Sequence, residues 1–392
     1  MAILSTLRRK TRLFSLTLLI KLLRAIILSV ARFTIKTKPH PDLIEHIPST
    51  SSSSSTTTSP PTKSETTIAA PSPTHNITLH IYNPPSTQTQ TQQRTGDFNL
   101  SPVLITACGS GFIIPGLGLD TSYCRLISNE TFHTVIDVGY RLAPEHPFPC
   151  AIEDLVSVVH WVRSQPSRFD INKISIGGFS AGGNIAASVA VNFFPPGTFW
   201  SLVLFYPVLD ACIPPGMKVA PSEYGSGEGN DGDRGSKGKG KGKKPPLGGM
   251  GSVPAFMMNI MEECYLGNAI ADAETKENAK AKSESDSDSN GTGKLSEDAL
   301  KDPRISPAYA DASRFPMRCL FVTAEYDCLA KEAEELAERI SINGDGEEGR
   351  KVVVHRVKGC GHQFDKNCRP GSERAKVRDE VYGLVVDLLR GN

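Results

Sequence analysis

Residues 173–184 read Lys-Ile-Ser-Ile-Gly-Gly-Phe-Ser-Ala-Gly-Gly-Asn, an apolar run that leads into a glycine-rich turn and then into small residues. The apolar run is typical of a buried strand, and the small residues after it are compatible with a helix. Ser180 therefore lies where a strand turns sharply into a helix, with Gly178 and Gly182 on either side. Such a turn exposes and aims a serine hydroxyl, so Ser180 is the candidate nucleophile.

Two further candidates complete the chain order Ser, Asp, His that a hydrolase of this type requires. A strand-like run over 317–324 ends just before Asp327, and another over 351–357 ends just before His362. Parallel sheets place their active sites at the carboxyl ends of strands, so both side chains are expected at one edge. We expect Asp327 to orient His362, and His362 to take a proton from Ser180 and later pass it to the leaving group.

Other interpretations of these residues are open at this point. Asp327 precedes a helical stretch over 329–340, so it can serve as the N-cap of that helix. His355 competes with His362, but it lies inside the alternating run and is expected on one face of the sheet. Glycines at 359 and 361 predict a loop around His362, which makes this histidine the better candidate base.

A third requirement is a set of backbone N–H groups that stabilise the oxyanion formed when a serine attacks a carbonyl. The strand-like run 102–108 is followed by Gly109, Ser110 and Gly111, whose small size lets the backbone approach a substrate. We expect the N–H groups of Ser110, Gly111 and Ala181 to form the oxyanion hole, with Gly109 shaping the loop. The alternative is an ordinary turn at the end of a strand.

Four segments together resemble the hormone-sensitive-lipase branch of the α/β-hydrolases. The most specific is Tyr-Arg-Leu-Ala-Pro-Glu-His-Pro-Phe-Pro at 140–149. The others are the turn at 108–112, the stretch 178–184, and the segment that begins Asp-Pro-Arg-Ile-Ser-Pro at 302 and ends His-Gln-Phe at 364. With its flanks, the resemblance extends over residues 75–212 and 252–392.

The resemblance implies an α/β-hydrolase fold, in which a mostly parallel central sheet is flanked by helices and topped by a cap region. It also implies hydrolysis of carboxylic esters with small or medium acyl chains. The chain departs from the family at two places: Cys-Gly-Ser-Gly at 108–111 replaces the usual His-Gly-Gly-Gly, and Phe179 replaces Asp or Thr. Since the hydrogen-bond donors of the first motif are backbone groups, Ser110 need not abolish the hole, although it restricts a position that requires positive φ.

The composition limits the remaining possibilities. The chain has 392 residues, 39% of them hydrophobic, and a formal net charge of +1, so it can bury one large α/β core and has no global bias toward nucleic acid. Its nine cysteines are irregularly spaced, without a C-x-x-C pair, and no H-E-x-x-H motif occurs. We therefore expect no disulfide framework, no metal, no cofactor and no specific nucleic-acid partner.

Residues 1–38 predict a membrane-associating segment. Cations at 8, 9, 10 and 12 precede an apolar stretch from 13 to 30, which Lys21 and Arg24 interrupt. On a helical wheel Lys10, Thr17, Lys21, Arg24 and Arg32 share one side, while Leu16, Leu19, Ile20, Leu23, Ile26, Ile27 and Val30 share another. We expect an amphipathic helix that contacts membrane lipid through residues 8–32. A signal anchor and a helix packed on the body of the protein are the alternatives.

Three polar stretches divide the rest of the chain. Residues 39–74 form a Ser/Thr/Pro-rich linker, after which the catalytic domain is expected over 75–392. Disordered insertions are predicted near 213–251 and 271–296; the first contains a basic run, 237–244, for which a solvated loop is the simplest interpretation. The apolar helix predicted between them, over 254–266, belongs to the cap region and lines the substrate pocket or packs in the core.

The hypothesis is a serine carboxylic-ester hydrolase, of the carboxylesterase or deacetylase kind, that forms an acyl-enzyme on small or medium-chain apolar esters. The rival is a catalytically weak receptor with the same fold, which binds a small hydrophobic ligand in the same cleft. A scaffold that acts through its basic loop is a third possibility. We expect a membrane-associated location, with the endoplasmic reticulum as a candidate and the side of the membrane left open.

Overall fold

The computed structural model describes residues 11–12, 14–25, 40–49, 75–85, 100–224, 245–249, 251–267, 269, 295–343 and 349–391. The Ser/Thr/Pro-rich part of the predicted linker, the basic run and most of the second predicted insertion lie outside these ranges. So does the apolar segment 26–30 of the predicted membrane helix.

Within the described residues, eight strands form one sheet in the order β1-β2-β4-β3-β5-β6-β7-β8. The pairs β1/β2 and β2/β4 are antiparallel, and all later pairs are parallel, which confirms the predicted mostly parallel sheet. The strands are β1 Leu43–Pro48, β2 Asn76–Tyr82, β3 Ser101–Ala107, β4 Thr134–Gly139, β5 Phe169–Phe179, β6 Ser201–Phe205, β7 Arg318–Ala324 and β8 Lys351–Val357.

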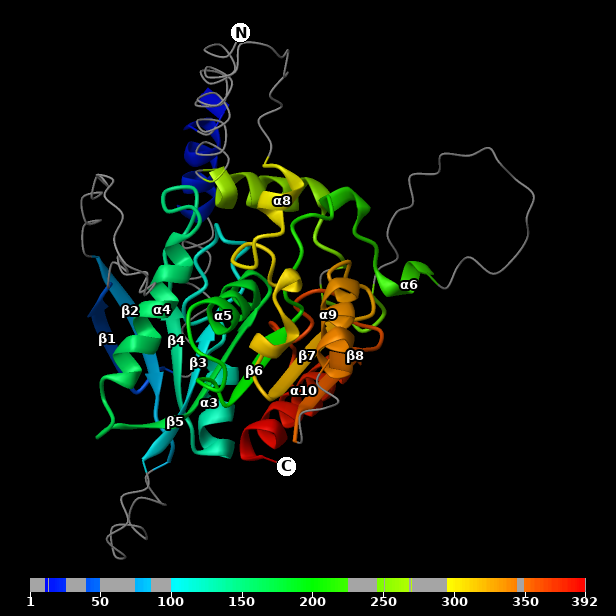
Figure 1. Cartoon of the computed structure of the whole chain (residues 1–392). Helices are drawn as coiled ribbons and strands as arrows, with labels where there is room; N and C mark the ends of the chain where they lie inside the picture. The colour runs from blue at the N-terminus through cyan, green and yellow to red at the C-terminus, as the bar shows by residue number, and fades with distance from the viewer. Residues whose placement is uncertain are drawn as a thin grey trace, which may run out of the picture.

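Helices cover both faces of the sheet (Figure 1). The side chains of α4, α5 and α9 contribute to one apolar core, and those of α3 and α10 to the other. This is the layer arrangement expected when parallel strands are joined by helical crossovers. The helices and turns are α3 Thr121–Thr131, α4 Cys150–Arg163, α5 Ala181–Asn192, η2 Pro215–Met217, α6 Pro221–Tyr224, α8 Glu297–Leu300, η3 Pro307–Tyr309, η4 Ala312–Arg314, α9 Ala330–Asn343 and α10 Glu373–Arg390.

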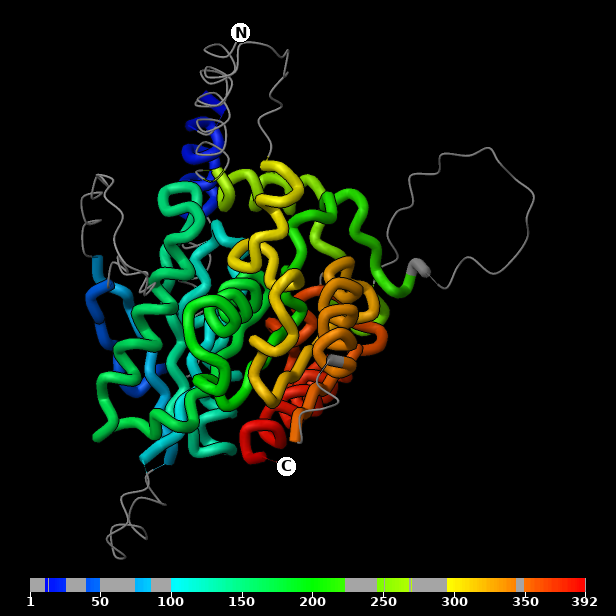
Figure 2. The backbone as a smooth tube through the Cα atoms, in the orientation of Figure 1, coloured from blue at the N-terminus to red at the C-terminus, as the bar shows by residue number. Residues whose placement is uncertain are grey.

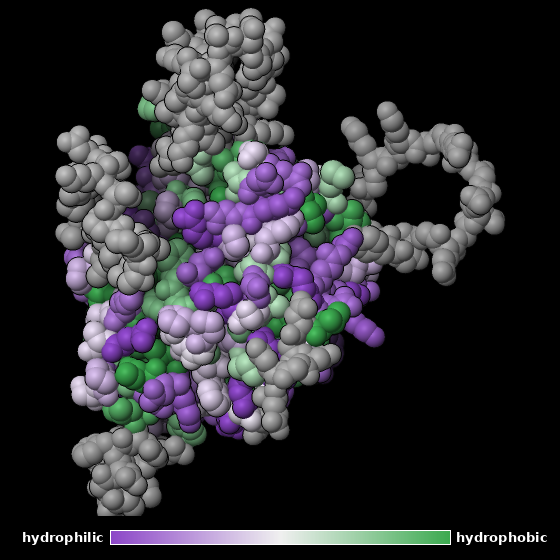
Figure 3. Space-filling model, in the orientation of Figure 1, coloured by the Kyte–Doolittle hydropathy of each residue, from purple (hydrophilic) through white to green (hydrophobic). Residues whose placement is uncertain are grey.

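The segments above the carboxyl ends of the parallel strands form a cap. A helix over residues 255–267 lies there beside α8, at the top of Figure 1. The outer face of the body drawn in Figure 3 is mostly hydrophilic with scattered apolar side chains, as expected for helices that bury one side against a sheet. The helix over 255–267 corresponds to the apolar helix predicted over 254–266, which is thus present in the cap.

A helix within residues 11–25 stands on the body beside this cap (Figure 2). Ile20 is buried, and Leu16 packs against the same core cluster. Arg24 also faces the body: its Nε donates to the carbonyl oxygen of Ile113 at 2.7 Å, and its Nη1 bonds Glu145 at 2.8 Å. This face of the helix packs on the body, as the alternative interpretation expects, and it combines Leu16 and Ile20 from the apolar side of the helical wheel with Arg24 from the basic side.

The opposite face of the same helix is apolar and exposed. Phe14, Leu18 and Leu22, spaced one turn apart, have 72%, 64% and 60% of their surfaces exposed. Arg12 extends across to Glu263 of the cap helix at 2.7 Å. Among the residues the structure describes, no helix combines the length and the apolar composition needed to cross a membrane.

The turn between β5 and α5 approaches the end of β3 so closely that it leaves no room for side chains. A Cβ on Gly182 would lie 2.1 Å from the carbonyl oxygen of Ala107 and 2.4 Å from that of Cys108. A Cβ on Gly178 would lie 2.4 Å from the carbonyl oxygen of Gly182. Backbone atoms cannot move aside as a flexible side chain can, so glycine is required at both positions.

We expect Gly182→Ala to lower the free energy of unfolding by about 3 kcal/mol, because the added methyl group forces the two chain segments apart. Gly383→Ala is the matched control, because a Cβ there meets nothing within 4 Å. Replacing a helical glycine by alanine is expected to raise the free energy of unfolding by about 0.5–1 kcal/mol. Urea unfolding followed by circular dichroism measures both. A Gly182→Ala protein as stable as the wild type would contradict the steric argument.

Candidate active site

The turn after β5 holds Ser180 in a backbone conformation that residues other than glycine rarely adopt, with φ 52° and ψ −118°. The Ser180 N–H donates to the carbonyl oxygen of Phe205 at 2.9 Å, which anchors the turn to the neighbouring strand β6. The side chain is nearly buried, at 6% exposure, yet it lines a cavity. A strained residue held in this way is a common feature of functional sites.

The structure brings Asp327 and His362 to Ser180 from the ends of β7 and β8. His362 Nδ1 lies 2.7 Å from Asp327 Oδ2, and His362 Nε2 lies 3.1 Å from Ser180 Oγ. All three side chains are buried. This geometry can move the hydroxyl proton to the imidazole, while the carboxylate holds the ring orientation and stabilises the imidazolium.

Asp327 also serves the local backbone, as its alternative interpretation expects. Its Oδ1 accepts a hydrogen bond from the N–H of Leu329 at 3.2 Å, at the start of α9. The two roles use different oxygens of one carboxylate, so they are compatible. His355 lies within β8 at intermediate exposure, and the structure records no contact between it and Ser180.

The loop after β3 lies directly beside Ser180. A Cβ on Gly109 would lie 3.5 Å from the Cβ of Ser180, and Gly111, with φ 54°, lines the same cavity as Ser180. Within the described part of the chain, the N–H groups of Gly109, Ser110, Gly111 and Ala181 donate no hydrogen bond. Of these four residues Gly111 lines the cavity, and free backbone N–H groups of this kind can stabilise an oxyanion.

The side chain of Ser110 braces this loop. Its Oγ accepts a hydrogen bond from the N–H of Phe112 at 2.8 Å and is hydrogen-bonded to the Tyr140 hydroxyl at 2.6 Å. The Tyr140 hydroxyl is also 2.7 Å from the carbonyl oxygen of Cys108. Positive φ occurs at Gly111 and Phe112 but not at Ser110, so serine here causes no backbone strain. Sequence reasoning missed Tyr140, although it opens the specific run at 140–149.

Phe179, the other departure from the family pattern, points away from the cavity. Its ring stacks on Phe205 at a centroid distance of 4.7 Å and packs edge-on against Tyr123. The Nζ of Lys366 lies 3.5 Å from the centre of the Phe179 ring, a cation–π contact. Phe179 therefore contributes to the core behind the nucleophile rather than to the walls of the cavity.

Lys366 joins the loop that carries His362 to the segment that follows the 109–111 loop. Its Nζ pairs with Asp120, just before α3, and with Asp365 at 2.8 Å. Burial opposes the charge of Lys366, but the two carboxylates outweigh that cost and raise its pKa.

Asp365 in turn accepts hydrogen bonds from the hydroxyl groups of Tyr206 and Tyr382 at 2.7 and 2.8 Å. The Tyr206 ring lies 4.7 Å from that of His362. The network around Lys366 thus supports the loop that carries His362.

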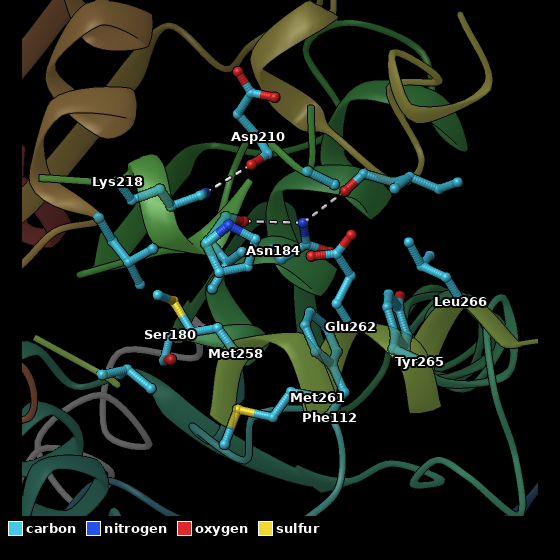
Figure 4. A pocket seen from close by; sticks show the side chains of 17 residues that line it. Phe112, Ser180, Asn184, Asp210, Lys218, Met258, Met261, Glu262, Tyr265 and Leu266 are labelled. Carbon is cyan, nitrogen blue, oxygen red and sulfur yellow. Dashed lines mark hydrogen bonds between the residues drawn. The ribbon is translucent and has the colours of Figure 1, made fainter. Parts of the chain in front are cut away.

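The cavity in front of Ser180 has a volume of about 670 Å³ including its open mouth. Figure 4 shows it with Ser180 on one side, Met258 and Met261 nearby, and Asp210 and Lys218 at the far end. The cap helix 255–267 contributes much of the wall. Most of the lining is apolar, so the cavity suits an apolar group next to a reactive serine. No group of three His, Cys, Asp or Glu side chains among the described residues is arranged to hold a metal ion.

Comparisons with known proteins agree with this architecture. A family model described as alpha/beta hydrolase fold matches residues 104–228 and 256–366, which together make up more than half of the chain. Among solved structures, the thermostable carboxylesterase EstE1 from a metagenomic library superposes with a TM-score of 0.61 at 22% identity, covering 95% of this chain and 97% of that one. An esterase of Pyrobaculum calidifontis gives a TM-score of 0.60 at 21% identity, covering 95% and 91%. At these identities the likeness shows the fold alone.

Sequence relatives include enzymes and a receptor. Esterase LipI of Mycobacterium tuberculosis is 35% identical over 125 residues, which is 31% of this chain and 37% of LipI. An arylesterase of Saccharolobus solfataricus is 36% identical over 85 residues, 21% and 28% of the two chains. The gibberellin receptor GID1B of Arabidopsis thaliana is 34% identical over 131 residues, 30% and 37%. The matched segments thus span less than two fifths of each of these relatives.

We expect Lys366→Met to lower the free energy of unfolding by about 3 kcal/mol, because it leaves two buried carboxylates without their cation. Lys301→Met is the control, since Lys301 pairs with Glu297 in an exposed position and a surface substitution changes stability by about 0.5 kcal/mol or less. Urea unfolding curves measure the difference. Equal losses in the two variants would show that the buried network contributes no more than a surface pair.

Proposed function

The chain belongs to the alpha/beta hydrolase fold family, in the hormone-sensitive-lipase-like branch, and on that premise we propose that it is a serine carboxylic-ester hydrolase. The observation that carries the proposal is the hydrogen-bonded series Asp327, His362, Ser180 beside an apolar cavity. The esterases among its sequence relatives support the same activity.

In the proposed reaction, His362 accepts the proton of Ser180 while Oγ attacks the ester carbonyl carbon. The resulting oxyanion accepts hydrogen bonds from the N–H groups of Ser110, Gly111 and Ala181. Collapse of the intermediate breaks the bond to the alcohol, which leaves with the proton from His362. Water, deprotonated by His362, then attacks the acyl-enzyme, and the acid is released as Ser180 regains its proton.

The volume and the mostly apolar lining of the cavity support small or medium acyl chains on apolar esters. Phe179 does not narrow the cavity, because its ring lies in the core behind the turn. The bonds of Ser110 to Tyr140 and Phe112 supply the bracing that a family histidine would otherwise provide. Neither departure therefore argues against activity.

We expect Ser180→Ala to reduce kcat/KM for p-nitrophenyl acetate and butyrate by at least about 10⁴-fold, because the nucleophile is lost. Ser164→Ala, which changes an exposed serine at the end of α4, should leave turnover unaltered. Hydrolysis is followed by p-nitrophenolate absorbance. Equal turnover by wild type and Ser180→Ala would rule out this mechanism.

A receptor is the second candidate, and the similarity to GID1B favours it. Such a protein would use the same cavity for a small hydrophobic ligand and would have no need of a reactive serine. Labelling with a fluorophosphonate separates the two functions. A label on Ser180 supports the esterase; tight ligand binding without any label would support the receptor.

We also propose that the helix within residues 11–25 attaches the protein to a lipid surface. The helix carries the exposed stripe of Phe14, Leu18 and Leu22 together with two cations, Arg12 and Lys21. These cations pair with Glu263 and Glu145, yet their side chains remain 68% and 59% exposed. Apolar side chains flanked by cations suit the boundary between anionic headgroups and acyl chains. Because the helix also contacts the cap, this surface would hold the cavity close to apolar esters.

We expect the double substitution Leu18→Asp with Leu22→Asp to reduce binding to vesicles of phosphatidylcholine and phosphatidylserine at least tenfold, since two carboxylates would enter the apolar layer. Ile342→Asp on α9 is the control, because Ile342 is equally exposed, at 62%, but lies elsewhere. Co-sedimentation with vesicles measures the bound fraction. Undiminished binding of the double variant would contradict the proposed surface.

A further inference from the structure

Two residues that line the Ser180 cavity each carry a buried polar atom with no hydrogen-bond partner among the described residues. These atoms are the hydroxyl oxygen of Tyr265 and the Oδ1 of Asn184. Both residues line the cavity, and they are only 4% and 2% exposed. Buried polar groups in native proteins are nearly always hydrogen-bonded, so two unpaired groups on residues that line one cavity require an explanation.

The orientation of the Asn184 amide is settled by its other contacts. Its Nδ2 donates to the carbonyl oxygens of Val208 and Ile305, both at 2.9 Å. Two carbonyl oxygens need the nitrogen of the amide, so a flipped side chain is excluded and Oδ1 remains as an acceptor. This atom can be satisfied only by a group that donates a hydrogen bond.

The Tyr265 ring is held by packing that does not involve its hydroxyl. It stacks on Phe112 with ring centroids 3.8 Å apart and meets the edge of Phe148 at 5.9 Å. A phenylalanine would make the same contacts and would leave no polar atom buried. The fold therefore accounts for the ring of Tyr265 but not for its hydroxyl.

The cap helix lines the cavity with the apolar side chains of Met258, Met261 and Leu266, and also with the carboxylate of Glu262, which lies near Asn184 and Tyr265 in Figure 4. Among the described residues, neither the Tyr265 hydroxyl nor Asn184 Oδ1 is hydrogen-bonded to this carboxylate or to any other group. An ester with a plain hydrocarbon chain would fill the cavity and leave both polar atoms unpaired, at a cost in affinity. A site built to bond a hydroxyl discriminates strongly against the analogue that lacks it, for the same reason.

We propose that this cavity takes esters whose apolar part carries a hydroxyl group, recognised by Tyr265 and Asn184. A hydroxyl is the smallest group that can donate to Asn184 Oδ1 and accept from the Tyr265 hydroxyl. This inference rests on the proposed esterase function and refines its substrate class. Tyr265 and Asn184 bind the part of the substrate that does not react, while Ser180 attacks the ester carbonyl.

The test compares esters that differ only in a terminal hydroxyl. One series has the hydroxyl on the acyl chain: p-nitrophenyl esters of 6-hydroxyhexanoic, 8-hydroxyoctanoic and 10-hydroxydecanoic acids against the unsubstituted esters. The other has it on the alcohol: monoacetates of the diols of the same lengths against the alkyl acetates. We expect at least one hydroxy ester to exceed its parent tenfold in kcat/KM, and the series in which it occurs identifies the end of the substrate in the cavity.

Tyr265→Phe should remove this preference. The ratio of kcat/KM for the hydroxy ester to kcat/KM for its parent ester should fall at least fivefold. The Tm of Tyr265→Phe should not fall, because the change removes a buried hydroxyl that has no partner among the residues the structure describes. Tyr82→Phe is the matched control: the Tyr82 hydroxyl bonds Thr121 Oγ1 at 3.0 Å in the other core. The Tm of Tyr82→Phe should fall, while its kcat/KM for the hydroxy ester relative to the parent ester should equal that of the wild type. Asn184 is less suitable for substitution, since its nitrogen also joins two loops.

Three results would overturn the inference: no preference in either series, a preference that survives in Tyr265→Phe, or a lower Tm of Tyr265→Phe with both esters affected alike. The Ser180→Ala protein distinguishes failure of this inference about the substrate hydroxyl from failure of the esterase proposal. Calorimetric titration of that variant with each hydroxy ester and its parent compares binding without turnover. Tighter binding of a hydroxy ester would support the subsite even in a protein that hydrolyses nothing, and equal binding throughout would refute it.

Discussion

The close contact between the β5–α5 turn and the end of β3 is the constraint on which the rest of the site depends. Gly182 lies against the carbonyl oxygens of Ala107 and Cys108, and Gly178 lies against Gly182 itself. This contact places Ser180 beside the loop that begins at Gly109, so Ser180 and Gly111 line one cavity. The positive φ of Ser180 is kept because the hydrogen bond to Phe205 and the neighbouring strands hold both ends of the turn.

The two departures from the family motifs are each matched by contacts from distant parts of the chain. Ser110 is bonded to Tyr140, which follows β4, and the loop is held without a histidine. Phe179 lies under the ammonium group of Lys366, which pairs with Asp120 and Asp365. One cation thus connects the residue before the nucleophile, the segment that follows the 109–111 loop and the loop that carries His362. Changes at 110 and 179 are compatible with an ordered site because these partners accompany them.

The N-terminal helix and the cap form a connected unit above the sheet. Arg12 bonds Glu263 on the cap helix, and Arg24 bonds the carbonyl oxygen of Ile113 next to the 109–111 loop. The same cap helix supplies Met261 and Tyr265 to the cavity wall. A surface that binds the exposed stripe of the N-terminal helix would therefore lie next to the cap that walls the cavity.

Much of the architecture could be predicted from local patterns, because a short segment of chain is enough to indicate a strand, a turn or a motif, and hence the order of the motifs. The strand at 351–357 has its predicted bounds, and those at 101–107 and 318–324 differ by one residue. β5 is longer than the apolar run at the start of 173–184, since its pairing with β3 begins at Phe169 and its pairing with β6 continues through Phe179. The residues Ser180, Asp327 and His362, the small residues of the 109–111 loop and the cap helix could be named in advance for the same reason.

What the sequence by itself determined is thus the α/β class, the order of the candidate site residues and the helical N-terminal segment. Only the tertiary structure decided which side of that segment faces the body and that Tyr140 and Lys366 support the site. It also decided that two cavity-lining residues, Tyr265 and Asn184, hold polar atoms without a partner in the described part of the chain. These features depend on contacts between side chains far apart along the chain, such as Arg24 with Glu145 or Lys366 with Asp120. A local pattern records which side chains are present, but their partners are set by the packing of the whole chain.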